Sequence, residues 1–89
     1  MAAILQLSPE RIDSWQMNAA RAMGNHGNPD HIPDLERSLV ESPYENVRGM
    51  SAWALGHIGG SRAHKALNHR RGMETGVVAE EIDRALSMQ

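Results

Sequence analysis

The chain has 89 residues, which is enough for one small domain with a modest core. Apolar residues make up 40% of it and charged residues 22%, as in an ordinary globular domain. It contains no cysteine, which excludes disulfides, iron–sulfur clusters and thiolate zinc sites from these residues. The opening MAAILQL lacks the basic start of a secretory signal, and no apolar run approaches the roughly 18 residues of a membrane span. We therefore expect a cytoplasmic protein that needs no cofactor and no membrane.

The charge is unevenly distributed along the chain. Residues 1–45 carry seven acids and three bases, residues 46–73 carry five bases and no acid, and residues 74–89 carry four acids and one base. The basic middle is interpreted either as a solvated helix face with scattered charge or as a local contact surface for anions or phosphate. Its candidate binding residues are the five bases and one of its histidines: Arg48, His57, Arg62, Lys65, Arg70 and Arg71.

The first predicted helix spans about residues 9–23. Ser8 is a suitable N-cap, and Pro9 suits the first helical position. Apolar residues then recur at three- and four-residue spacing as far as Met23, and Gly24 is expected to end the helix.

The second predicted helix begins after a cap at Asn28 or Asp30. Ile32, Leu35 and Leu39 form a single apolar stripe along it. A proline inside a helix breaks the hydrogen-bond ladder, but Pro33 falls in or near the first turn, where that cost largely disappears.

The third predicted helix spans about residues 43–58. In the stretch SPYE, Ser42 and Glu45 have the spacing of a capping box, and Pro43 suits the first position. Val47, Met50, Ala54 and Ile58 share one face, and two glycines at 59 and 60 end the helix.

Two further helices complete the chain. Ser61 is expected to cap a helix through about residue 70, with Ala63, Ala66 and Leu67 facing inward. The last helix carries Val78, Ile82, Ala85 and Leu86. No stretch alternates at period two for long enough to predict a strand, so the fold class is all-α.

An internal repeat organises these helices. An offset of 32 residues aligns Ala20 with Ala52, Ala22 with Ala54, Met23 with Leu55, Gly24 with Gly56, Gly27 with Gly59 and Leu35 with Leu67. An offset of 31 then aligns Val47 with Val78 and Leu55 with Leu86. Two helices per unit at such a period are typical of an α-solenoid, in which stacking buries faces that one pair cannot bury alone. We predict a single domain over residues 1–89, with repeats at about 9–40 and 43–71 and a partial third unit at about 74–88.

A stripe of small residues predicts close helix packing. Gly49, Ala52 and Gly56 follow one another at three- and four-residue spacing in the third helix. Because glycine costs roughly 0.5–1 kcal/mol relative to alanine inside a helix, its presence here suggests a closely approaching neighbour.

These residues resemble a known repeat family. The stretches VRGMSAWALGHIG and NAARAMGNHGNPDHIPDLERSL are similar to HEAT-like repeats of the phycobilisome-lyase type. The pair resembles most closely the C-terminal HEAT-like region of epoxyqueuosine reductases, through Asn18–Ala20, Met23–Asn25, Ile32–Glu36, Val47–Gly49 and Ala52–Gly56. Met17 and Met50 depart from that pattern, where the family has arginine and histidine.

The resemblance implies a binding role and no catalysis by this chain alone. The reductases carry a cobalamin-binding catalytic domain and a ferredoxin-like domain with two four-iron clusters, and this chain has neither the length nor the cysteines for them. What the resemblance can transfer is a part in holding the tRNA substrate.

Trp53 is the remaining candidate binding residue. It aligns with Arg21 of the first repeat, so it is not expected in the deep core. It can stack on a base or anchor a partner side chain, or it can pack in the groove between neighbouring helices.

Three other features have competing interpretations. Arg70 and Arg71 either bind phosphate or simply lie favourably at a helix C-terminus. The resemblance to HEAT-like units implies that Arg48 bridges neighbouring repeats through an acid, and Glu41 and Glu45 are the candidates. The histidines show no metal-binding spacing, and no catalytic arrangement is evident.

The sequence therefore predicts a non-catalytic HEAT-like binding module that assists tRNA engagement through its basic middle. The alternative is a general protein–protein scaffold of the HEAT type. Since solenoids usually need three or more units, we expect the end faces to be covered by self-association, by a partner protein or by the first helix acting as a cap.

Overall fold

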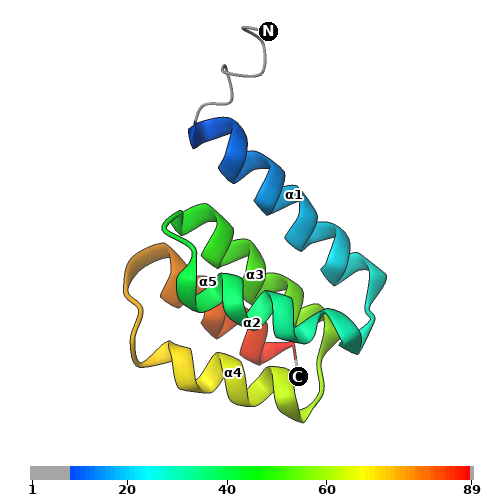
Figure 1. The fold of residues 1–89 in the computed structure, drawn as a ribbon. Coiled ribbons are helices and arrows are strands. Elements are labelled where there is room, and N and C mark those ends of the chain that lie inside the picture. Colours follow the sequence, from blue (N-terminus) through cyan, green and yellow to red (C-terminus); the bar gives the residue numbers. More distant parts are fainter. Residues whose placement is uncertain (1–8, 89) are drawn as a thin grey trace, which may run out of the picture.

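The computed structural model describes residues 9–88, and this part of the chain is built from five α-helices (Figure 1). The helices are α1 (Pro9–His26), α2 (Ile32–Glu41), α3 (Glu45–Ile58), α4 (Ser61–Arg71) and α5 (Gly76–Ser87), with a short 3-10 helix, η2 (Pro29–His31), before α2. The predicted all-α fold is confirmed. The described helices include none that is long and apolar enough to cross a membrane.

The end of α1 differs from the prediction. The helix continues through Gly24 to His26, so Gly24 does not end it. Gly27 takes that role, with a positive φ of 71° and an N–H that donates to the Met23 carbonyl at 3.1 Å. The predicted cap at Ser8 lies outside the described residues.

The short helix η2 leads directly into α2. The Asn28 side-chain oxygen accepts a hydrogen bond from the Asp30 N–H at 2.9 Å, so Asn28 caps η2. The predicted cap of α2 at Asn28 or Asp30 is wrong, because His31 holds the N-cap position of α2 and makes no side-chain hydrogen bond there. Pro33 lies in the first two positions of α2, where a backbone N–H has no acceptor within the helix. Ile32, Leu35 and Leu39 are buried, as their spacing predicted.

The predicted capping box of α3 is wrong. The helix begins at Glu45, with Tyr44 in the extended N-cap position and no side-chain cap. Ser42 lies two residues before Tyr44, and its hydroxyl oxygen accepts a hydrogen bond from the Tyr44 N–H at 3.2 Å. Ser42 therefore shapes the turn between α2 and α3 instead of capping the helix.

The start of α4 also differs from the prediction. Gly60, with a φ of 91°, holds the N-cap position, and Ser61 is the first helical residue rather than the cap. Gly59 and Gly60 both have positive φ, which lets the chain reverse between two helices within two residues.

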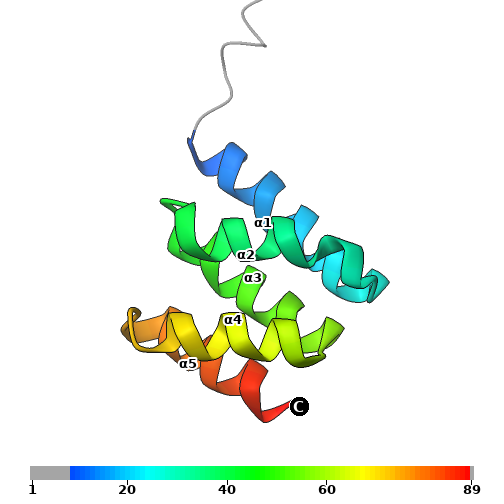
Figure 2. The same cartoon turned by 60° about the horizontal axis from the view of Figure 1, so that its bottom comes forward.

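The helices form two layers. Figure 2 shows α2 and α4 side by side in one layer, with α1, α3 and α5 crossing behind them in the other. Each layer adds one helix per repeat, which is the arrangement of a solenoid. Between the layers lies an almost fully buried core, which includes Leu35, Leu39, Leu55, Leu67 and Ile82.

Two glycines allow the helices of the second layer to approach closely. A Cβ on Gly24 would lie 2.8 Å from the Ala54 Cα, and a Cβ on Gly56 would lie 2.8 Å from the Ala85 Cα. The contact between α1 and α3 is thus repeated between α3 and α5. Gly49 does not belong to this contact, since its Cβ would lie 3.6 Å from the nearest side-chain atom, on Glu81. The close approach predicted for the small-residue stripe is therefore confirmed at Gly56 and absent at Gly49.

Candidate binding site

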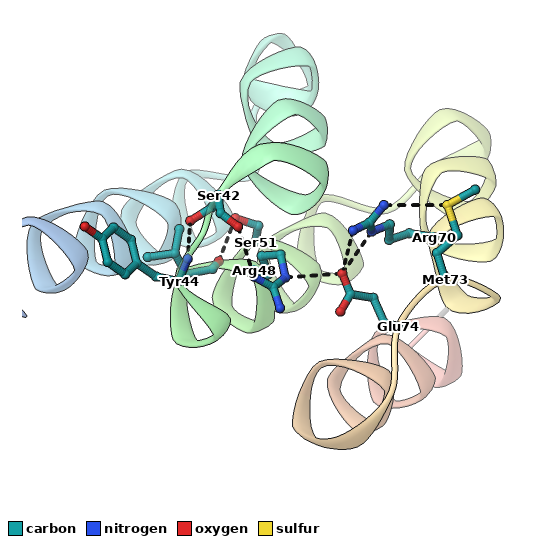
Figure 3. A network of polar contacts seen from close by, with 8 residues as sticks. Ser42, Tyr44, Arg48, Ser51, Arg70, Met73 and Glu74 are labelled. Carbon is teal, nitrogen blue, oxygen red and sulfur yellow. Dashed lines mark hydrogen bonds and ion pairs between the residues drawn. The ribbon is translucent and has the colours of Figure 1, made fainter. Parts of the chain in front are cut away.

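Arg48 and Arg70 meet at a single buried carboxylate, that of Glu74 (Figure 3). Arg70 Nε donates to Glu74 Oε2 at 2.9 Å, and Arg48 Nε lies 3.2 Å from the same oxygen. The Glu74 side chain is only 6% exposed, against 20% for Arg48 and 19% for Arg70. The contact of Arg48 with Glu74 is ionic, because its Nε–H does not point at the oxygen. The one negative charge of Glu74 thus stabilises two half-buried positive charges, and the cluster keeps a net charge of +1.

Arg48 also contacts the end of the first repeat. Arg48 Nη1 donates to the backbone carbonyl of Ser42 at 2.9 Å, just beyond the C-terminus of α2. The expectation that Arg48 bridges neighbouring units is confirmed, but its predicted acids, Glu41 and Glu45, are wrong. The partner is Glu74, in the turn between α4 and α5. Glu74 lies four residues after Arg70, and this spacing was the signal in the sequence for the pair of Arg70 and Glu74.

Two of the three other bases of the middle segment have acidic partners from its flanks. Arg62 makes two hydrogen bonds to Glu36 on α2, at 3.0 and 3.2 Å. Arg71 pairs with Asp83 on α5. Lys65 is the one base of the five with no carboxylate within 4.0 Å among residues 12–88. The basic middle therefore folds against the acidic segments on either side of it.

Trp53 lies in the groove between α1 and α3. Its ring carbon Cζ3 is 2.8 Å from where a Cβ on Gly24 would be, so the indole covers the backbone of α1. One edge stacks on His57, with ring centroids 3.9 Å apart and planes inclined by 34°. The half-buried indole also lines a groove of about 420 Å³ together with Arg21, Met50 and Val77. Packing between helices and contact with a ligand are thus compatible at this residue.

The seven candidate residues do not form one surface. Trp53 and His57 belong to the layer of α1, α3 and α5, whereas Arg62 and Lys65 line a groove between α2 and α4 in the other layer. Arg48 and Arg70 are tied to Glu74, and Arg71 is exposed at the end of α4. The bases that a ligand could reach are Arg62, Lys65 and Arg71.

Two of the five histidines, His26 and His31, lie close together. His26 Nδ1 and His31 Nε2 are 3.3 Å apart across the turn between α1 and α2. Among the described residues, no group of three or more histidine, aspartate or glutamate side chains could hold a metal ion.

The stacked helical pairs define an α-solenoid, and the HEAT repeats family matches residues 2–87. The chain belongs to this family. It is 34% identical over 74 residues to proteins named epoxyqueuosine reductase from Bacillus cereus and Bacillus anthracis. The match covers 82% of this chain and 20% of each relative, so the chain spans about a fifth of the length of these relatives. No solved structure matches the chain.

Proposed function

We propose that the chain is a non-catalytic HEAT-repeat module that assists tRNA engagement in a queuosine-modifying system. The observation that carries this proposal is the 34% identity with epoxyqueuosine reductases over most of the chain. The aligned part is one fifth of those enzymes, and its fold is a repeat scaffold. We therefore assign to it a role in holding the substrate.

Three exposed bases are suited to this role. The side chains of Arg62 and Arg71 are 62% and 58% exposed, and both pair with acids at the surface. Exposed ion pairs contribute only about 0–1 kcal/mol, so a phosphate can replace the carboxylate at little cost. Lys65 lies one turn from Arg62 and lines the same groove. Arg48 and Arg70 are excluded, because removing them from Glu74 would leave a buried carboxylate unpaired.

The salt dependence of tRNA binding tests this proposal. Three phosphate contacts imply a slope of log affinity against log salt of about −2 to −3, which is a loss of about 16- to 64-fold between 50 and 200 mM salt. Binding that is absent at 50 mM, or that does not respond to salt, contradicts the proposal.

A matched pair of variants locates the contact. We expect Arg62→Gln with Arg71→Gln to weaken tRNA binding and to reduce the salt slope by about 2. Arg37→Gln with Arg84→Gln removes two arginines that are 66% and 67% exposed and also ion-paired, so it changes net charge equally. Equal weakening by both pairs would show that net charge alone, and not this surface, attracts the RNA.

A general protein scaffold is the second candidate. The groove beside Trp53 favours it, because Met50, Trp53 and Val77 give it an apolar floor while Arg21 and Glu81 lie at its border. If Trp53→Ala leaves tRNA binding unchanged, the groove beside Trp53 takes no part in RNA binding and is available to a protein partner.

A further inference from the structure

The groove between α1 and α2 is open, whereas the equivalent surface of the second repeat, between α3 and α4, is covered by α2. In the second repeat, α2 packs against both α3 and α4, and Ser51, Leu55 and Leu67 are fully buried. Their equivalents 32 residues earlier are Ala19, Met23 and Leu35, which line a groove of about 330 Å³ between α1 and α2. Ala19 is exposed and Met23 half-buried there. The first repeat thus presents the surface that α2 covers in the second.

A polar contact is repeated as well. In the second repeat, Arg48 donates to the Ser42 carbonyl at the C-terminal end of α2. The residue 32 positions before Arg48 is Gln16, and it lines the open groove. Its side-chain amide is a hydrogen-bond donor and can bind the terminal carbonyl of a helix placed as α2 is placed on α3.

The groove between α1 and α2 carries acidic residues where the equivalent surface of the second repeat carries a base. The link between α2 and α4 joins Glu36 of α2 to Arg62 of α4. The equivalent of Arg62 in the first repeat is Asp30, and the edge of α2 that lines the open groove carries Asp34 and Glu41 against one arginine, Arg37. A helix in this groove therefore needs a base where α2 has its glutamate.

We propose that the groove between α1 and α2 binds a basic amphipathic helix of a partner protein, lying beside α2 and continuing the layer of α2 and α4. The helix would have apolar residues spaced as Ile32, Leu35 and Leu39 are on α2, and a lysine or arginine at the position that corresponds to Glu36. This site is separate from the exposed bases of the tRNA proposal and does not depend on them.

A second copy of the chain does not provide such a helix. The basic helix of the described residues is α4, and its apolar residues Ala63 and Leu67 are fully buried in the core. Both α2 and α5 carry three acids and one arginine. Among the residues that the structure describes, a folded second copy therefore has no free basic amphipathic helix, and the occupant that we propose is a helix of a partner protein.

Peptides derived from the chain itself test the proposal. The probe is a capped peptide of residues 29–42 with Glu36→Arg, and its control is the same peptide with Asp34→Arg instead. Both peptides also carry Asp30→Asn and Glu41→Gln, so that each has a net positive charge. Both peptides gain the same charge, but only the first places it on the edge facing α2. We expect the Glu36→Arg peptide to bind the 89-residue chain ~3-fold more tightly by fluorescence anisotropy. It should also shift the backbone amide signals of Ala19 and Met23 in NMR spectra.

Variants of the groove complete the test. Ala19→Arg should weaken binding of the Glu36→Arg peptide at least about tenfold by filling the groove. Asn18→Arg adds the same charge at a neighbouring exposed position that does not line the groove, and should leave binding unchanged. Equal binding by these two variants, or equal binding of the two peptides, overturns the proposal. It is also overturned if the chain dimerises in sedimentation and the peptide dissociates the dimer, since the groove then belongs to a second copy.

Discussion

Replacing a glycine of α3 by alanine should have opposite effects at Gly49 and Gly56, although both lie in the same helix and are buried. At Gly56 the new methyl group would be 2.8 Å from both the Cα and the Cβ of Ala85, and the backbone of α5 would have to move. Such overpacking costs typically about 1–3 kcal/mol. Alanine regains about 1 kcal/mol of helix propensity, so the net effect is a destabilisation of up to about 2 kcal/mol.

At Gly49 the balance is reversed. The nearest atom to a Cβ there is a flexible side-chain carbon of Glu81 at 3.6 Å, an ordinary contact distance. Only the propensity term remains, so Gly49→Ala should stabilise the chain by about 0.5–1 kcal/mol.

Thermal unfolding followed by circular dichroism at 222 nm measures both variants. For a domain of this size, 1 kcal/mol corresponds to about 4–8 °C in Tm. We expect Gly56→Ala to lower Tm by up to about 15 °C and Gly49→Ala to raise it by about 2–8 °C. A shift of both variants in the same direction would refute the reasoning. A rise of Tm in both would mean that α3 and α5 do not approach each other closely at Gly56, and a fall in both would mean that a methyl group does not fit at Gly49.

Two further changes test the buried charge and the cap. Glu74→Gln should lower the free energy of unfolding in urea by about 2–4 kcal/mol, because Arg48 and Arg70 both lose a carboxylate that is only 6% exposed. Asp83→Asn, which breaks an exposed pair, should cost less than about 1 kcal/mol in the same titration, and a cost similar to that of Glu74→Gln would argue against burial as the cause. Asn28→Ala should cost about 1 kcal/mol, because the Asp30 N–H loses its acceptor; an unchanged urea midpoint would mean that this cap contributes nothing.

The repeat and its helices could be predicted because their signals are local. The apolar stripe of α2 and the positive-φ glycines after α3 each act within a few residues of the element that they define. The errors at the helix starts are of one or two residues. The local pattern around Ser42 is compatible with a helix cap and with a turn. The structure has the turn, in which the Ser42 carbonyl accepts a hydrogen bond from Arg48.

The charge pairing could not be predicted in the same way. The sequence showed an excess of bases between residues 46 and 73, but not which acids would approach them. Glu36 lies 26 positions from Arg62, and Glu74 lies 26 positions from Arg48. Those pairs form only once the helices are stacked, so the basic segment looked like an open surface in the sequence and is largely neutralised in the fold.

Glu74 also affects how the molecule unfolds. In a simple solenoid each unit contacts only its neighbours, so the stack can open from either end one unit at a time. Here one carboxylate before α5 holds Arg48, and Arg48 holds the carbonyl at the end of α2. Loss of the partial third unit would therefore release the last turn of the first repeat as well. The two helical pairs and the partial third unit are thus linked through Arg48, and we expect the short stack to open as a whole instead of unit by unit.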